Sequence, residues 1–141
     1  MSFVLDASVA LLWLAPSTNP AGVDYAAAAL RATTMSPAVA PSILLLDVAN
    51  VVAKLEAKRL VTEADAQRYI SLLSRLAITI DPATAEHALG ETLSLARRYK
   101  LSAYDAAYLE LSLRNGLALA TLDTDLTKAA MSAGVPVFGI R

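Results

Sequence analysis

Four aspartates stand where predicted strands end or predicted helices begin, namely Asp6, Asp47, Asp105 and Asp123. Carboxylate oxygens are the ligands that hard divalent cations such as Mg²⁺ take in proteins, together with waters and substrate phosphates. Carboxylates gathered in one place repel one another, and a cation relieves that repulsion. If the fold brings these residues together, they could hold a divalent metal ion together with waters and a substrate phosphate.

The first of these acids follows a short apolar run at the start of the chain. Phe3–Leu5 is apolar throughout, Asp6 ends it, and a helical pattern follows at once. An apolar run of this length before a helix is typical of a strand buried on both faces, as in the centre of a parallel sheet. Ligands of open α/β sheets bind at the carboxyl ends of the strands, so Asp6 is predicted to stand at that edge.

The other three acids are predicted to reach the same edge. Asp123 ends the apolar run that follows Gly116, and Asp105 lies in the first turn of a helix predicted over 102–115. Asp47 lies about one turn into a helix predicted from Ser42 to Arg59, just after a short strand. Helix starts that follow strands in this way lie near the carboxyl edge of the sheet.

Strands and helices alternate along the whole chain. Helices are predicted over 7–14, 24–31, 42–59, 62–76, 81–99, 102–115 and 123–133, and strands over 3–5, 39–40, 78–80, 117–122 and 135–140. Such alternation indicates a parallel sheet with helices on both faces and right-handed crossovers. We therefore predict an α/β fold: a three-layer α/β/α domain with a central parallel sheet of four or five strands. Residues 1–141 are expected to form this single domain.

Each acid also has a purely structural explanation. Asp6 and Asp123 could cap the helices that follow them, and Asp105 could complete a capping box. Asp47 is harder to explain in this way, because it lies in the apolar stretch 43–52 of a helix predicted to be buried on more than one side. An ionised carboxylate buried there needs a charge partner or a metal.

Composition narrows the possible partners and surroundings. Charged residues make up only 18% of the chain, against about 25% in typical domains, and hydrophobic residues make up 56%. Part of the apolar surface is therefore expected to be covered by a second copy, as in a homodimer, or by a dedicated partner. A net charge of −1 gives no global basic field for nucleic acid. The absence of cysteine, of a basic leader and of a long apolar run favours a cytoplasmic protein without a membrane span.

Four stretches of the chain resemble, in the same order, the motifs of one known family. They are Val4–Val9 (VLDASV), Pro41–Val52 (PSILLLDVANVV), Leu101–Leu109 (LSAYDAAYL) and Leu119–Asp123 (LATLD). Each stretch contains one of the four aspartates, and together they spread over nearly the whole chain. On these motifs the sequence resembles the PIN-domain ribonucleases, and among them the VapC-type toxins of VapBC toxin–antitoxin pairs.

The resemblance implies a metal-dependent endoribonuclease, the toxin of a type II toxin–antitoxin pair, which hydrolyses RNA phosphodiester bonds to a 5′-phosphate and a 3′-hydroxyl. It implies four catalytic acids, Asp6, Asp47, Asp105 and Asp123, and Mg²⁺ or Mn²⁺ as the cofactor. The first, third and fourth of these would bind the metal directly. The family usually has glutamate where this chain has Asp47, so the shorter side chain would reach the metal through a water. A cognate VapB-type antitoxin is the implied protein partner, wrapped around the apolar helices near Ile43–Leu76.

Further polar residues adjoin the predicted acids. Ser8 and Thr121 are hydroxyls suited to hydrogen bonds with the metal ligands or with phosphate. Asn50 follows Asp47 by about one helical turn and is similar in role. Asp125 is an auxiliary acid or an ordinary helix-capping residue.

Three other functions fit parts of the pattern. A phosphotransfer hydrolase of the haloacid-dehalogenase type needs a second aspartate at position 8, where this chain has Ser8. A receiver-type signalling domain would use Asp81 as phosphate acceptor, but the paired acids and lysine that it needs are absent. A PIN fold that binds RNA without cutting it remains the main alternative. With one histidine, His87, and no cysteine, zinc sites and triad hydrolases are disfavoured.

Overall fold

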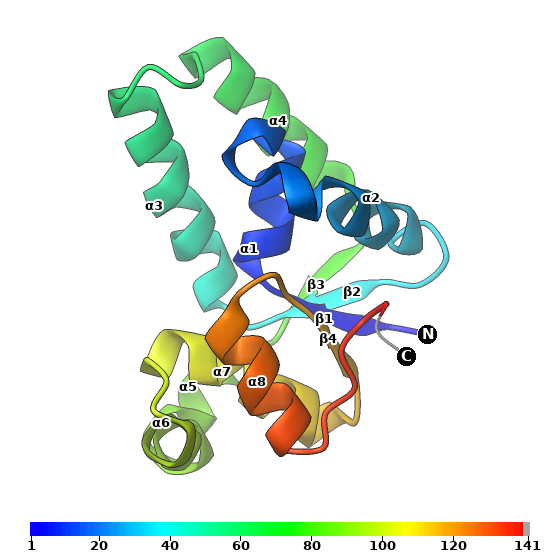
Figure 1. Ribbon diagram of the computed structural model, residues 1–141, viewed down its shortest axis with the longest axis vertical. Helices are drawn as coiled ribbons and strands as arrows, with labels where there is room; N and C mark the ends of the chain where they lie inside the picture. Colours follow the sequence, from blue (N-terminus) through cyan, green and yellow to red (C-terminus); the bar gives the residue numbers. More distant parts are fainter. Residues whose placement is uncertain (140–141) are drawn as a thin grey trace.

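A sheet of four parallel strands forms the centre of the molecule (Figure 1). The structure is a computed structural model and describes residues 1–139. The strands run in the order β3-β2-β1-β4, and their bounds are β1 Phe3–Leu5, β2 Ala38–Ala40, β3 Ile78–Ile80 and β4 Ala118–Ala120. Val4 at the centre pairs with Val39 on one side and Leu119 on the other. The predicted α/β fold with a parallel sheet is confirmed.

Helices cover both faces of this sheet (Figure 1). Helices α1 to α4 lie on one face, and α5 to α8 lie on the other. Their bounds are α1 Ala7–Ala10, α2 Val23–Ala32, α3 Ile43–Ala57, α4 Glu63–Arg75, α5 Thr84–His87, α6 Leu93–Tyr99, α7 Ala103–Asn115 and α8 Thr124–Ser132, with short 3₁₀ turns η1 Leu11–Trp13, η2 Pro16–Thr18 and η3 Pro20–Gly22. None of the described helices is long and apolar enough to cross a membrane.

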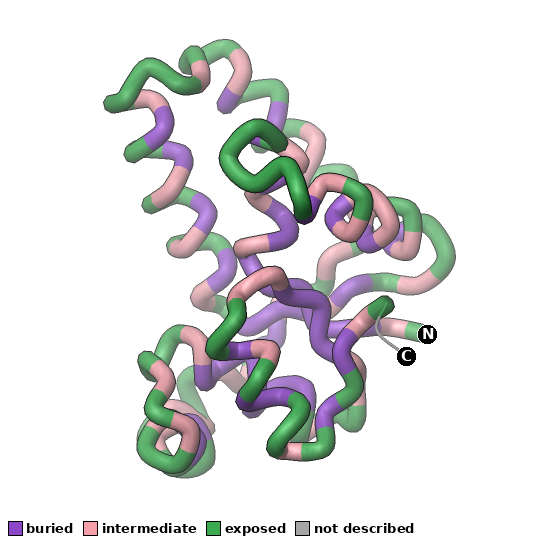
Figure 2. Tube along the Cα trace, viewed as in Figure 1, coloured by how far each residue is buried: buried purple, intermediate pink, exposed green. Residues whose placement is uncertain are grey.

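The sheet and the inner faces of the helices form one continuous apolar core (Figure 2). All three residues of β1 are buried, as expected for the central strand of a sheet covered on both faces. Helix α7 contributes the longest buried run, from Ala106 to Ser112. This helix packs on both β1 and β4, so its first turn is held firmly at the carboxyl edge of the sheet.

Three predicted elements differ from the structure. The first helix is α-helical only to Ala10 and continues as the 3₁₀ turn η1, shortly before Pro16 ends it. The helix predicted over 81–99 is broken into α5, the π-helical turn η4 (Ala88–Thr92) and α6, because Gly90 adopts non-helical angles of φ −105° and ψ −105°.

The strand predicted over 135–140 is absent from the described residues, and its last residue lies outside them. Only a single bridge joins Val137 to Leu119 of β4. Pro136 has no amide to donate, and Gly139 turns the chain at φ +75°, so the segment does not continue as a ladder.

Helix α3 is more exposed in this chain than its sequence predicts. Leu45 and Leu46 are 60% and 67% exposed, whereas Leu44 and Val48 are buried. The apolar residues therefore form one buried stripe and one exposed stripe. The exposed stripe gives the helix a surface that the fold of one chain leaves uncovered.

Candidate functional site

Asp6 is a buried carboxylate at the carboxyl end of the central strand. Its Oδ2 accepts hydrogen bonds from Ser8 Oγ at 2.6 Å and from Thr121 Oγ1 at 2.8 Å. It stands before α1 but makes no side-chain capping bond, so the capping explanation does not hold. Burial raises the pKa of Asp6 to about 6, although the two hydroxyls act to lower it.

The same two hydroxyls join the ends of neighbouring strands β1 and β4. Ser8 Oγ accepts the amide of Leu122 at 2.9 Å, and Thr121 Oγ1 accepts the amide of Asp123 at 3.0 Å. The backbone amide of Asp6 also donates to Ala120 at 3.0 Å. Ser8 and Thr121 therefore link the carboxylate of Asp6 to the backbone amides of Leu122 and Asp123.

Asp105 lies in the first turn of α7 and is half-buried. Its amide donates to Ser102 Oγ at 3.1 Å, which is one half of a capping box. No return bond from the Asp105 carboxylate is found among the described residues, so the carboxylate is available for other interactions. Burial raises the pKa of Asp105, and the charges of Asp123 and Asp47 raise it further.

These effects on pKa indicate that the predicted acids lie within electrostatic reach of one another. Asp105 is close enough to Asp47, Asp123 and Asp125 for each charge to disfavour its ionisation, and its own charge does the same to Asp6. The first turns of α1, α3, α7 and α8 lie at one edge of the sheet (Figure 1). We call Asp6, Asp47, Asp105 and Asp123 the acid cluster.

Asp47 takes a partner that the sequence analysis missed. Tyr108, fully buried on α7, donates its hydroxyl to Asp47 Oδ2 at 2.7 Å. Asp47 itself is only half-buried, because α3 is partly exposed at this level. The premise that Asp47 is fully buried is therefore wrong, and its need for a cation stays a prediction. The signal in the sequence was a tyrosine one turn after Asp105 on an otherwise apolar face.

The remaining predicted residues lie around the acid cluster. Asp123 caps α8, as its structural explanation predicted, by accepting the amide of Leu126 at 3.3 Å. Asp125 is exposed in the first turn of α8 and reaches Asp105 only through its charge. Asn50 is exposed on α3 and makes no side-chain hydrogen bond within the described residues. The structure thus gives no supporting contact for Asn50.

A second tyrosine also lies near the cluster without having been predicted. The hydroxyl of Tyr25, on α2, is buried and has no hydrogen-bond partner among residues 1–139. Burial raises the pKa of Tyr25, and the charge of Asp6 contributes to the rise. Tyr25 therefore borders the acid cluster from the helix layer opposite α7.

The chemistry of these residues fits a hard divalent cation, and their spacing limits how it would bind. The charges of neighbouring carboxylates contribute to the raised pKa values of Asp105 and Asp6, and the four acids together provide oxygen ligands for a cation that would relieve this repulsion. Among residues 1–139, however, no group of three or more acidic, histidine or cysteine side chains lies close enough together to enclose a metal ion. Mg²⁺ suits such a site, because it is usually held by one or two carboxylates and keeps several waters.

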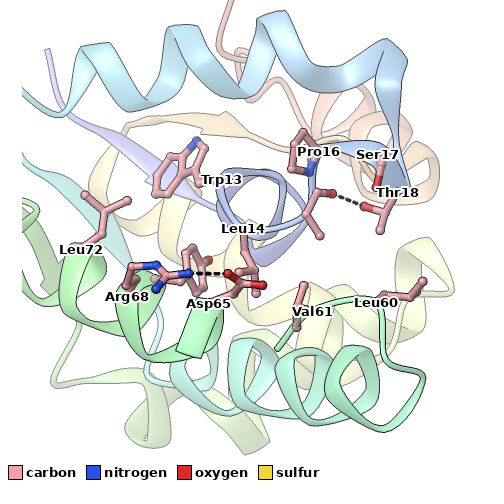
Figure 3. A pocket seen from close by; sticks show the side chains of 12 residues that line it. Trp13, Leu14, Pro16, Ser17, Thr18, Leu60, Val61, Asp65, Arg68 and Leu72 are labelled. Carbon is pink, nitrogen blue, oxygen red and sulfur yellow. Dashed lines mark hydrogen bonds and ion pairs between the residues drawn. The ribbon is translucent and has the colours of Figure 1, made fainter. Parts of the chain in front are cut away.

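The acid cluster is separate from the larger hollows of the molecule. One hollow, of about 460 Å³, lies between the turns η1 and η2 and helix α4 (Figure 3). Its lining includes Trp13, whose indole donates to the carbonyl of Ala26 at 2.8 Å, and Arg68 beside Asp65. No member of the acid cluster lines it, so we assign it no part in the chemistry.

Comparison with known proteins gives a family and two similar structures. The chain resembles PAE2754 from Pyrobaculum aerophilum at 23% identity and a TM-score of 0.62, over 92% of this chain and 79% of the other. It resembles FitAcB from Neisseria gonorrhoeae at 21% identity and a TM-score of 0.63, over 99% and 97%. No curated protein sequence matches. The model of the PIN domain matches residues 3–131, nearly the whole length, and the chain therefore belongs to the PIN domain family.

Proposed function

We propose that this protein is a Mg²⁺- or Mn²⁺-dependent endoribonuclease and the toxin of a type II toxin–antitoxin pair, of the VapC type. PIN domains are typically nucleases, which supports a phosphodiester hydrolysis as the reaction. The observation that carries the proposal is the convergence of Asp47, Asp105 and Asp123, whose charges together disfavour ionisation of Asp105. Such a cluster is costly to the apoprotein unless a cation occupies it.

In this proposal Asp6, Asp105 and Asp123 supply the metal ligands, one or two of them directly and the rest through metal-bound waters, and Asp47 acts through a water. A bound cation would supply an acidified water and neutralise charge on the phosphate. Ser8 and Thr121 both donate hydrogen bonds to Oδ2 of Asp6 and so fix the orientation of its carboxylate. The cap that Asp123 forms on α8 anchors that side chain in the same way.

Cations beside the cluster favour a polyanionic substrate. A hollow of about 310 Å³ between α6 and α8 is lined by Lys100, Lys128 and Asp125 among others. Asp125 is also within electrostatic reach of Asp105, so this hollow adjoins the acid cluster. We propose that the two lysines bind the RNA phosphates next to the scissile phosphate. Such local cations matter because the chain has a net charge of −1 and therefore no global basic field.

The partner proposed for this protein is a VapB-type antitoxin. An apolar groove of about 540 Å³ runs between α3 and α4, and its lining includes Val48, Val52, Ile70 and Leu73. A groove of this kind fits the apolar face of an amphipathic peptide. We further propose that the protein is a homodimer in the cytoplasm, with its exposed apolar residues covered by protein.

The test is cleavage of total RNA by the wild-type protein with and without Mg²⁺, beside three single variants, D6N, D105N and D123N. We expect wild type to cut RNA only when the metal is present and each variant to lose at least about 100-fold, since each loses a ligand charge. Ligation of adaptors to the products would show whether they carry a 5′-phosphate and a 3′-hydroxyl.

The matched control is D24N, which removes an exposed aspartate in the first turn of α2. This variant should cut as wild type does. Equal cleavage by wild type and all three site variants would refute the residue assignments. Retention of RNA in a gel-shift assay without cleavage, in either metal, would instead favour the RNA-binding alternative.

A further inference from the structure

Tyr108 connects α3 and α7, the two helices that carry Asp47 and Asp105. It lies on α7, three residues after Asp105, and its hydroxyl donates to Asp47 Oδ2 of α3 at 2.7 Å. The ring is fully buried, with an exposed fraction of 0%. A hydroxyl at this depth reaches a side chain 61 residues away in the sequence, at the edge of the candidate active site.

Tyr108 differs from Tyr69, another buried tyrosine, in the group that accepts the hydrogen bond of its hydroxyl. Tyr69 is also buried and donates its hydroxyl to the backbone carbonyl of Ala10 at 2.6 Å, a bond that joins α4 to α1. A backbone carbonyl is already fixed, so that bond serves packing alone. The carboxylate of Asp47 is on a rotatable side chain, and a hydrogen bond to one oxygen restricts its rotamers.

We infer that Tyr108 is a positioning residue, which holds the Asp47 carboxylate in the orientation that the metal site uses. One helix, α7, would then supply the acid Asp105 and also orient the acid Asp47. Oδ1 of Asp47 accepts no hydrogen bond from the described residues, so it is free to meet a metal-bound water. The inference depends on the proposed function, because it assigns Asp47 to that site.

Fixing a ligand before the metal arrives should improve binding, since the rotamer entropy of Asp47 is not lost on binding. Removal of a residue that orients a metal ligand typically costs roughly 10- to 100-fold in metal affinity or activity. We therefore expect Y108F, which deletes one oxygen and keeps the ring, to bind Mn²⁺ at least about 10-fold more weakly. Its kcat should fall with little change in KM for RNA.

The experiment measures Mn²⁺ affinity by titration calorimetry and cleavage by steady-state kinetics in wild type, Y108F, D47N and the double variant. The matched control is Y69F, which removes the other buried hydroxyl and should leave both quantities unchanged. Because Tyr108 is inferred to act through Asp47, adding Y108F to D47N should have no further effect on Mn²⁺ affinity. A full additive loss in the double variant would overturn the inference.

Two further outcomes keep the inference separate from the proposed function. If Y108F binds Mn²⁺ as tightly as wild type does, the positioning role is overturned. If Y108F fails to fold, an unchanged Mn²⁺ affinity in D47N overturns it instead. If wild type binds Mn²⁺ but does not cut RNA, while Y108F still binds more weakly, the ribonuclease proposal fails and the positioning role stands.

Discussion

At the scale of single residues, Asp6 is a carboxylate whose burial disfavours its ionised form. The side chain is only 5% exposed, and burial is the largest cause of its raised pKa. The hydroxyls of Ser8 and Thr121 offset part of this cost without removing it. The folded apoprotein therefore holds a proton on Asp6 more tightly than the unfolded chain does.

This difference predicts how D6N changes stability with pH. The pKa of Asp6 rises from 3.8 unfolded to about 6 folded, so wild type loses stability as pH rises through this interval. We expect D6N to be more stable than wild type at pH 7 by on the order of 2 kcal/mol, and by much less at pH 4. Urea unfolding of both metal-free proteins at the two pH values measures this. A difference that does not depend on pH would contradict it.

The repulsion within the acid cluster predicts a second effect, that of the metal on folding. An ion that binds only the folded state at 100 times its Kd stabilises it by about 2.7 kcal/mol. Mg²⁺ or Mn²⁺ should therefore raise the melting temperature of wild type, and EDTA should reverse the rise. The variant D105N should show a much smaller rise in melting temperature, because the charges of Asp123, Asp47 and Asp125 all act on Asp105. An equal rise in D105N would argue that the ion binds elsewhere.

At the scale of elements, one arginine joins the end of β3 to α7. Arg114 donates to both oxygens of Asp81, at 2.6 and 3.2 Å, and to both oxygens of Glu110, at 2.8 and 2.9 Å. Asp81 and Glu110 are buried, and the guanidinium lowers the pKa of Asp81 below its usual value. This ion-pair network helps to hold α7, and with it Asp105, against the sheet.

Replacement of this arginine by methionine should destabilise the fold strongly. R114M leaves two buried carboxylates without their guanidinium partner, although Thr84 and the amide of Ala83 still donate to Asp81. Loss of the cation costs about 3–5 kcal/mol of unfolding free energy at neutral pH. Because the pKa of Asp81 is lowered in the folded state, the stabilisation is present above its unfolded value of 3.8 and is lost below it. The deficit of R114M should therefore shrink in acid.

The matched control for this change is R75M, on the exposed surface of α4 near the end of the helix. Chemical denaturation should show a change below about 0.5 kcal/mol for R75M, as for most exposed positions. Equal stability of R114M and wild type at pH 7 would show that the network contributes nothing.

At the scale of the whole molecule, apolar side chains remain uncovered. Leu45, Leu46 and Ile70 are exposed beside the groove between α3 and α4, and Leu89 is 87% exposed elsewhere. Exposed apolar surface of this kind is typical of an interaction site. It accords with the homodimer and antitoxin proposed above.

We predict a dimer in solution from these exposed residues. Light scattering at micromolar concentration should give twice the mass of 14.8 kDa. A charged substitution at an exposed position of the groove, I70D, should weaken capture of an apolar helical peptide, whereas K54A at the exposed side of α3 should not. A monomeric mass would refute the dimer, and unchanged capture by I70D would place the peptide elsewhere.

Much of this architecture could be predicted because it depends on local patterns. The apolar run before Asp6 marked the central strand, and Gly116 ends α7 in the left-handed conformation that glycine favours. Helix α4 begins within one residue of its predicted start, where Thr62 and Asp65 form a capping box. The segment after Val135 was wrongly predicted as a strand, because pairing depends on a distant partner rather than on the apolar run itself.

The sequence by itself determined the alternation of strands and helices and the placement of acids at strand ends and helix starts. Short-range periodicity and capping encode both of these. Only the tertiary structure decided the partner of each acid: Asp6 between Ser8 and Thr121, and Asp47 beneath Tyr108. Apart from the bond of Ser8 to Asp6, these contacts join residues far apart in the chain, and side-chain packing selects them after the backbone pattern is set.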